Sequence, residues 1–160
     1  MIEAKNIQDK IVMVTGAGGS IGSELCRQII LNQPKMLVIY ELTEFALYDI
    51  DKELRKTAQC EIIPILGTVQ DQQKLERIIE QYHIQTVYHA AAYKHVPLVE
   101  CNPIAGLKNN AIGTANSLNA AVKKGVETFV LISTDKAVRP TNVMGASKRM
   151  AELYCQAVAE

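Results

Sequence analysis

Short apolar runs alternate with longer amphipathic stretches along the whole chain. The apolar runs predict strands at Ile11–Thr15, Met36–Tyr40, Glu61–Leu66, Thr86–His89 and Thr128–Ser133. The stretches between them have helical spacing and predict helices at Ser20–Leu31, Glu44–Thr57, Gln70–Tyr82, Pro103–Lys124 and Asn142–Glu160. Strands that alternate with helices of this length predict a parallel sheet covered on both faces. With right-handed crossovers, this is an α/β fold with a Rossmann-like, doubly wound sheet.

Details of the pattern refine the predicted helices. Ile21, Leu25 and Ile29 recur at helical spacing, so we expect all three to face the sheet. Gly125 follows the fourth helix as its predicted C-terminal cap, and Pro140 precedes the fifth.

The length of 160 residues and the 48% of apolar residues suit a single domain with an aliphatic core. The pattern stops at Glu160 within a helix, without a capping signal or a sixth strand. We therefore expect residues 1–160 to be the first part of a longer α/β domain. The alternative is a small natural protein whose last helix frays.

The 17 basic and 17 acidic residues cancel, which argues against nucleic acid and against an anionic membrane surface as partners. The four cysteines are scattered and have no histidine at metal-ligand spacing, so we expect reduced thiols and no metal. No signal peptide and no apolar run of about 20 residues is visible. These features predict a cytoplasmic protein.

A glycine series follows the first predicted strand directly. Gly16, Gly19 and Gly22 lie at the turn from strand to helix, and Ser20 and Ile21 open the helix. Glycine allows the sharp bend and the approach of a pyrophosphate to the backbone, while the helix N-terminus supplies free N–H groups and positive dipole. The series predicts a dinucleotide site, and a turn without a ligand is the alternative.

Glu41 ends the second predicted strand, 19 residues after Gly22. A carboxylate here accepts hydrogen bonds from a ribose 2′-hydroxyl and repels a 2′-phosphate, which favours NAD. NADP stays open because Lys35 and Lys52 are close in sequence, and a solvated glutamate is a further alternative.

With these features in place, the chain resembles the extended short-chain dehydrogenase/reductase superfamily along nearly its whole length. Within it, the chain is most similar to the bacterial polysaccharide-biosynthesis group of UDP-N-acetylglucosamine 4,6-dehydratases. Four segments carry the resemblance: Val14–Gly22, His89–Glu100, Asn110–Thr114 and Ser133–Lys148. The second and fourth segments are the more specific ones.

The resemblance implies further cofactor contacts. The backbone of Ala90, Ala91 and Ala92 is expected to pass beside the dinucleotide, and Asn110 to support the fourth and fifth strands near the nicotinamide. Thr68 stands where many members of the superfamily have an acidic residue for the adenine amine, and its hydroxyl is expected to contact the base instead.

The superfamily uses a Ser or Thr, a Tyr, and a Lys four residues after the Tyr. The matching residues here are Thr134, Met144 and Lys148, and a thioether cannot exchange a proton. The spacing of four places the last two on one helix face. Large-form, membrane-linked dehydratases of the group carry methionine at this position, so Met144 is interpreted as a mark of that subgroup.

The implied reaction oxidises the sugar at C4, eliminates water across C5 and C6, and returns the hydride to C6. Elimination needs a base for the C5 proton and an acid for the C6 hydroxyl. Asp135 and Lys136 follow the fifth strand at the carboxyl edge of the sheet, and we expect them to be buried and to share this work. Thr134 is expected to bond the C4 oxygen. Which of Asp135 and Lys136 is the base stays open.

Three further residues follow the fourth strand. Lys94 is predicted to contact the sugar or a phosphate, with a solvent-exposed charge as the alternative. Tyr93 is a weak candidate to replace the missing phenol, because it follows a different strand. His95, like His83 and His89, is predicted to be structural.

The sequence thus predicts an NAD(P)-dependent lyase acting on a UDP-sugar. The alternatives are a C5-inverting dehydratase, an epimerase, or a dinucleotide-binding module without catalysis. Met144 favours retention at C5, because inverting members generally carry Tyr there. The resemblance also implies a homo-oligomer. Anchoring of the parent chain in the inner membrane stays an open alternative. The resemblance further implies that residues 1–160 are the NAD(P)-binding Rossmann domain and end before a C-terminal substrate-binding part. We therefore expect residues 1–160 alone to bind dinucleotide weakly, if at all, and to turn over nothing.

Overall fold

The structure, a computed structural model, describes residues 2–159. Its strands are β1 (Ile11–Thr15), β2 (Met36–Glu41), β3 (Glu61–Leu66), β4 (Thr86–His89) and β5 (Thr128–Leu131). Its α-helices are α1 (Ser20–Leu31), α2 (Glu44–Leu54), α3 (Gln72–Tyr82), α4 (Val96–Cys101), α5 (Pro103–Leu107), α6 (Gly113–Lys123) and α7 (Val143–Ala159). Three short elements complete the fold: η1 (Ala4–Asn6), the π-helical η2 (Lys108–Ile112) and η3 (Asp135–Ala137).

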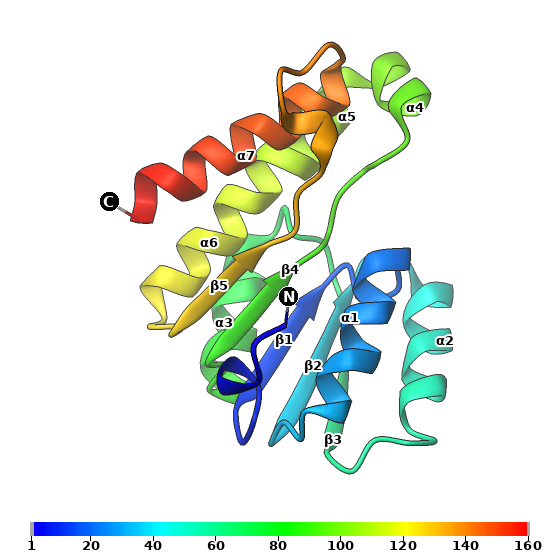
Figure 1. The fold of residues 1–160 in the computed structure, drawn as a ribbon, viewed down its shortest axis with the longest axis vertical. Coiled ribbons are helices and arrows are strands. Elements are labelled where there is room, and N and C mark those ends of the chain that lie inside the picture. The colour runs from blue at the N-terminus through cyan, green and yellow to red at the C-terminus, as the bar shows by residue number, and fades with distance from the viewer. Residues whose placement is uncertain (1, 160) are drawn as a thin grey trace.

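The five strands form one parallel sheet in the order β3-β2-β1-β4-β5 (Figure 1). The chain moves outward from β1 to β3 and then crosses back to β4, so the direction of winding reverses beside β1. In such sheets ligands bind at the carboxyl edge where the winding reverses. The predicted Rossmann-like fold is confirmed.

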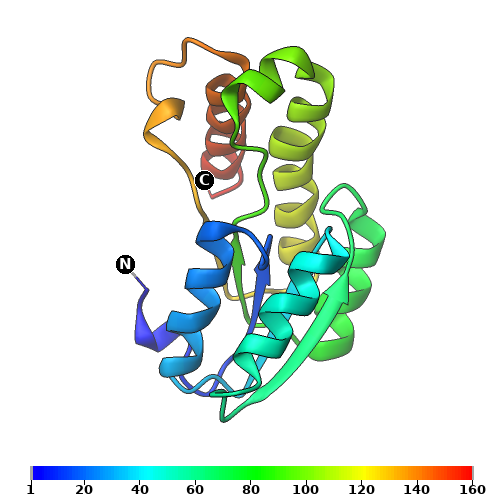
Figure 2. The same cartoon turned by 90° about the vertical axis from the view of Figure 1, so that its right-hand side faces the viewer.

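Helices cover both faces of the sheet. Helices α1 and α2 lie on one face, and α3 and α6 lie on the other, where they contact each other (Figure 2). Alternate residues of the strands enter the two apolar clusters: Val12 and Val14 face α1, whereas Met13 faces α3. None of the helices within residues 2–159 has the length and apolarity needed to cross a bilayer.

The predicted strands were right to within two residues, and the helices less so. The fifth strand ends at Leu131 and not at Ser133. The third helix begins at Gln72 and not at Gln70, because the Asp71 side chain accepts the Lys74 amide at 2.9 Å and caps it. The predicted helix over residues 103–124 is three pieces, with the π turn in the middle. Helix α4 was missed, and the predicted end at Glu160 lies outside the described residues.

One predicted core residue was wrong. Ile21 is 55% exposed, whereas Ile29 is buried and Leu25 is half-buried. The first turn of α1 projects beyond the sheet to its carboxyl edge, so the helix face that packs on the strands starts with Gly22 and continues with Cys26. Ile21 therefore lines a groove instead of the core.

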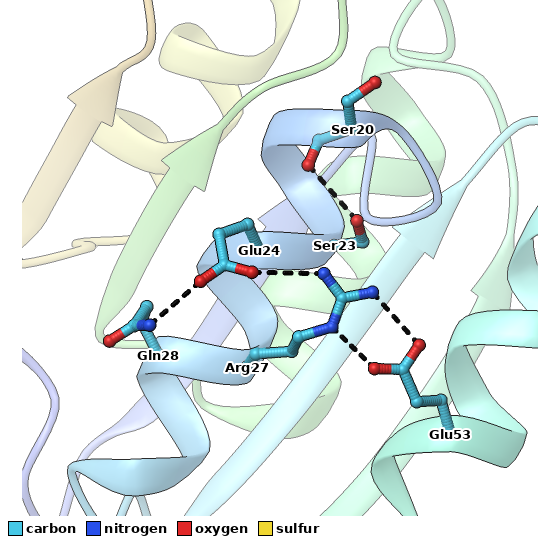
Figure 3. A network of polar contacts seen from close by, with 6 residues as sticks. All are labelled: Ser20, Ser23, Glu24, Arg27, Gln28 and Glu53. Carbon is cyan, nitrogen blue, oxygen red and sulfur yellow. Dashed lines mark hydrogen bonds and ion pairs between the residues drawn. The ribbon is translucent and has the colours of Figure 1, made fainter.

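Side chains on the outer surface join α1 to α2 (Figure 3). Arg27 donates to both oxygens of Glu53, with Nη2 3.0 Å from Oε2, and to Glu24 at 3.1 Å. The geometry is bidentate, but both side chains are exposed. Such pairs contribute roughly 1 kcal/mol or less.

Gly125 ends α6 as predicted. It lies at φ +71°, its amide donates to Val122 O at 3.2 Å, and the Val126 amide donates to Ala121 O at 2.9 Å. These two bonds form a Schellman motif, which directs the chain into β5.

We predict that Gly125→Ala destabilises the chain by about 1 kcal/mol, because only the left-handed backbone opposes the methyl group. A Cβ at this position meets nothing within 4 Å. The measurement is urea unfolding followed by circular dichroism. Val122→Ala, at an exposed position of the same helix, is the control and should change stability by less than about 0.5 kcal/mol. Equal stability of both variants would contradict the capping role.

Candidate active site

A groove runs along the carboxyl edge of the sheet. It consists of two hollows, of about 140 Å³ and about 460 Å³, which share Gly19, Ala90, Ala92 and Tyr93. The smaller hollow lies over β2 and β3, and the larger one lies between α1, β5 and α7. All the predicted cofactor and catalytic residues except Asn110 and Asp135 thus line one groove.

The glycine loop is folded tightly on itself. Gly16 has φ +68°, and a Cβ on it would lie 2.7 Å from the backbone of Ala91. A Cβ on Gly22 would lie 1.9 Å from Gly16 O. The protein itself therefore requires glycine at both positions. Gly19 is different: a Cβ there would meet only Gly16 O at 3.3 Å, and the residue is exposed to the groove.

The N-terminus of α1 opens into the groove. No side chain caps it, and the first amide bonded across the turn is that of Ser23, which donates to Gly19 O at 2.9 Å. The amides of Ser20, Ile21 and Gly22 are thus left for a ligand, the arrangement that binds phosphate at helix N-termini. Lys94 Nζ donates to Ser20 Oγ at 2.9 Å, so its charge lies at this same end.

Glu41 lies in the smaller hollow with Thr68. Its carboxylate accepts the Gly18 amide at 3.1 Å and the Thr43 amide at 3.3 Å. The acid is thereby held against the glycine loop, and its remaining lone pairs can accept a ribose hydroxyl.

The buried Tyr40 of β2 holds the loop that carries Thr68. The Tyr40 hydroxyl donates to Thr68 O at 2.8 Å, and a Cβ on Gly67 would lie 2.4 Å from that hydroxyl. Burial raises the pKa of Tyr40 to about 12, so the phenol stays a donor. Thr68 Oγ1 accepts the Gln70 amide at 3.2 Å. The hydroxyl proton of Thr68 is left to donate to a nucleobase bound in the hollow.

Ala90, Ala91 and Ala92 line the groove where β4 ends. Asn110 is buried and binds both backbone groups of Tyr93, accepting the amide at 2.7 Å and donating to the carbonyl at 3.0 Å. It also donates to Ser147 Oγ at 3.0 Å. Asn110 therefore joins the end of β4 to α7, and no hydrogen bond runs from its side chain to β5.

Asp135 and Lys136 open the turn η3 above the end of β5, and Thr134 is the N-cap of this turn. Thr134 Oγ1 donates to Asp135 Oδ1 at 3.0 Å and accepts the Lys136 amide at 3.3 Å. Thr134 and Lys136 line the larger hollow, and Asp135 stands beside it. The expected burial of Asp135 and Lys136 was wrong: both residues are exposed, although the backbone of the turn packs on α7, where a Cβ on Gly145 would lie 2.3 Å from Lys136 O.

Met144 and Lys148 lie on one face of α7, and both are buried walls of the larger hollow. Lys148 Nζ donates to Ile132 O at 2.8 Å. Burial lowers the pKa of Lys148, and Glu152 one turn further on opposes that shift. Met144 places a thioether where the superfamily has a phenol, so no proton can be exchanged there.

Four polar contacts at the site were not foreseen from the sequence. The Ser133 hydroxyl donates to Glu152, and the Val143 amide donates to Glu100 of α4, which caps α7. His89 is fully buried between Thr15 and Thr114. Sequence spacing does not reveal these pairs, because their members lie on separate elements.

The other histidines are exposed. His83 ends α3 at φ 54°, and His95 precedes α4 at the rim of the groove. Tyr93 lies at the junction of the two hollows and follows β4, whereas Met144 lies on α7.

The site combines a glycine loop, an acid at the end of β2 and a lysine on α7. These are the features of a dinucleotide-binding short-chain dehydrogenase/reductase of the extended type, and the predicted resemblance is confirmed. A family model described as polysaccharide biosynthesis protein matches residues 12–160, so the chain belongs to that family.

Two curated proteins and one solved structure show the range of similarity. The chain is 50% identical over 152 residues to "Probable polysaccharide biosynthesis protein EpsC" of Bacillus subtilis (strain 168), covering 94% of this chain and 25% of EpsC. It is 33% identical over 140 residues to a UDP-N-acetylglucosamine 4,6-dehydratase (inverting) of Campylobacter jejuni subsp. jejuni serotype O:2, covering 87% of this chain and 40% of that protein.

A UDP-glucose 4-epimerase of Stenotrophomonas maltophila, solved with bound NAD and a UDP-sugar, shares the fold. Its TM-score is 0.86 at 20% identity, and the match covers 94% of this chain and 48% of the epimerase. The chain thus spans a quarter to a half of the length of these proteins.

We predict that His89 makes the chain sensitive to acid. Burial, and secondarily the charge of Lys148, lowers the pKa of His89 to about 3. In the unfolded chain His89 takes up a proton near pH 6.5, and in the folded chain it does not. The contribution of His89 to the free energy of unfolding is therefore fully present above pH 6.5 and is lost as the pH falls towards 3. The expected loss is roughly 1 kcal/mol per pH unit, measured by urea unfolding across this range.

His89→Gln keeps a donor and an acceptor and removes the titration, so its stability should fall less steeply on acidification than that of the wild type. His95→Gln, at an exposed position, is the matched control and should keep the wild-type slope. The same slope for all three proteins would show that His89 is not kept neutral by the fold.

Proposed function

We propose that this chain is the dinucleotide-binding part of a nucleotide-sugar 4,6-dehydratase that acts in polysaccharide biosynthesis. The observation that carries the proposal is the η3 turn: Thr134 and Lys136 open onto the same hollow as Lys148, with Asp135 bonded to Thr134. An alcohol dehydrogenation alone needs no such second pair of acid and base. Elimination of water does need one.

The substrate class follows from similarity. The Campylobacter relative is named for UDP-N-acetylglucosamine, and EpsC for polysaccharide biosynthesis. We therefore propose a UDP-N-acetylhexosamine, with UDP-N-acetylglucosamine first, as the substrate. The proposal includes a cytoplasmic reaction and a homo-oligomer, as the resemblance implies.

The residues present suit NAD. Gly16, Gly19 and Gly22 leave the helix amides open to a pyrophosphate, and Glu41 faces the place of the adenosine ribose. Lys148 would hold the nicotinamide ribose. When bound, the dinucleotide accepts and returns the hydride of the sugar.

The residues of η3 carry the proton chemistry. Asp135 and Lys136 supply the base for the C5 proton and the acid for the C6 hydroxyl. Lys136 lines the hollow, whereas Asp135 reaches it through Thr134, which we assign to the C4 oxygen. The buried Met144 leaves Thr134 and its neighbours as the route for the C4 proton.

We predict a preference for NAD over NADP of at least about tenfold in Kd, or roughly 1.4 kcal/mol. No lysine or arginine lines the smaller hollow. Lys35 precedes β2 at the opposite edge of the sheet, about 20 Å from Glu41. Lys52 lies near the far end of α2, with Nζ 5.8 Å from the centre of the Tyr48 ring. Neither can reach a 2′-phosphate.

Titration of the chain with each dinucleotide, followed by NMR, tests this preference. Glu41→Gln should narrow the difference by removing the repelling charge, and Glu44→Gln, at an exposed position outside the hollow, should leave it unchanged. Tighter binding of NADP by the wild type would overturn the assignment of Glu41.

We also predict that Asp135→Asn, in the full-length protein that contains this domain, lowers turnover of UDP-N-acetylglucosamine at least ~10²-fold. The amide keeps the shape but cannot take up a proton. Product NMR measures the 4-keto-6-deoxy sugar, and its ring couplings distinguish retention from inversion at C5. Asp49→Asn on the exposed side of α2 is the control. Near-wild-type turnover would remove Asp135 from the mechanism.

A further inference from the structure

Five residues with fully buried polar side chains are joined by a line of hydrogen bonds behind the groove, and the step from Thr114 to Asn110 runs through the Asn110 backbone carbonyl. They come from β1, β4, η2, α6 and α7, and each is at most 1% exposed: Thr15, His89, Asn110, Thr114 and Ser147. The line contains no ion pair, and no buried side-chain polar atom among the described residues lacks a partner. A polar network this complete inside a core holds its members in one arrangement.

The direction of the bonds follows from counting protons. Thr114 Oγ1 donates its one proton to Asn110 O at 2.7 Å. It must therefore accept from His89 Nε2, which lies 3.0 Å away. Because the buried ring is neutral, Nδ1 is then an acceptor, and Thr15 Oγ1 donates to it at 2.7 Å. His89 is thus held as the Nε2–H tautomer.

The far end of the line is equally determined. The Asn110 amide donates to Tyr93 O and to Ser147 Oγ, and its oxygen accepts from the Tyr93 amide and from Asn109. Ser147 then donates to Met144 O at 2.6 Å. The π turn η2 makes this possible, because its wider winding turns both Asn109 and Asn110 inward.

The two ends of the line stand beside the two ends of the groove. Thr15 precedes Gly16 of the phosphate loop, and Ser147 precedes Lys148 on α7. A dinucleotide that reaches from the loop to Lys148 binds best when these two sites keep a fixed separation.

We propose that this line of hydrogen bonds sets the separation between the phosphate loop and Lys148, with His89 and Thr114 as positioning residues for the dinucleotide. This inference rests on the proposed function in taking a dinucleotide as the ligand. It gives the buried histidine a role that requires no proton transfer.

The test compares NAD with ADP, which occupies the adenosine and pyrophosphate end alone. Thr114→Val keeps the shape of the side chain and breaks the line in the middle. We expect the Kd of ADP to change less than about twofold and that of NAD to rise about tenfold, the effect of a misplaced second site. Thr114→Ser should restore both values. Binding is followed by NMR titration of the chain.

Ser117→Ala is the matched control, because Ser117 is also buried on α6 and donates only to Gly113 O at 2.8 Å. Ser117→Ala should lower the free energy of unfolding and leave the ratio of the Kd values of NAD and ADP unchanged. If Thr114→Val does not fold, Ser147→Ala breaks the line at its end and should separate the two ligands in the same way. Equal weakening of NAD and ADP, or the same separation in Ser117→Ala, would overturn the positioning role.

Nitrogen-15 spectra of the wild-type chain report the His89 tautomer without any ligand. Nε2–H with an unprotonated Nδ1 supports the direction of the line, and the Nδ1–H form contradicts it. If the full-length protein that contains this domain binds neither NAD nor ADP, the proposed function fails and the positioning role fails with it, while the spectra still decide the tautomer.

Discussion

A Cβ on Gly22 would lie 1.9 Å from the carbonyl oxygen of Gly16, and a Cβ on Gly16 would lie 2.7 Å from the backbone of Ala91. Three segments of backbone therefore touch without any side chain between them: the end of β1, the start of α1 and the end of β4. This contact determines where α1 begins and how closely β4 passes the phosphate loop. The groove, the free amides of α1 and the placement of Lys94 over Ser20 all depend on it.

Much of this arrangement could be predicted from the sequence. Apolar runs such as Ile11–Thr15 are buried on both faces, so their pattern depends little on neighbours, and four of the five strands were found to within one residue. The glycine loop and Lys148 could be recognised because steric demands and helical spacing leave few residue types in those positions. The roles of Thr134, Asp135 and Lys136 stay predictions.

Other features depend on contacts between distant elements. The π turn at Lys108–Ile112 has no local signal, because it exists to bring Asn110 to Tyr93 and Ser147. Ile21 has the spacing of a core residue, yet the helix extends past the sheet at that point. Asp135 was expected to be buried because it follows a predicted strand. The strand ends at Leu131, before the predicted end at Ser133, and the chain leaves the sheet there.

Gly19 separates two kinds of selection on the same loop. Gly16 and Gly22 are demanded by the backbone, so any descendant of this chain that folds must keep them, whatever it binds. A methyl group on Gly19 would approach only one oxygen, at 3.3 Å, a contact that a shift of a few tenths of an ångström relieves. Folding thus constrains Gly19 less than the other two glycines, and a lineage that lost its nucleotide would lose Gly19 first.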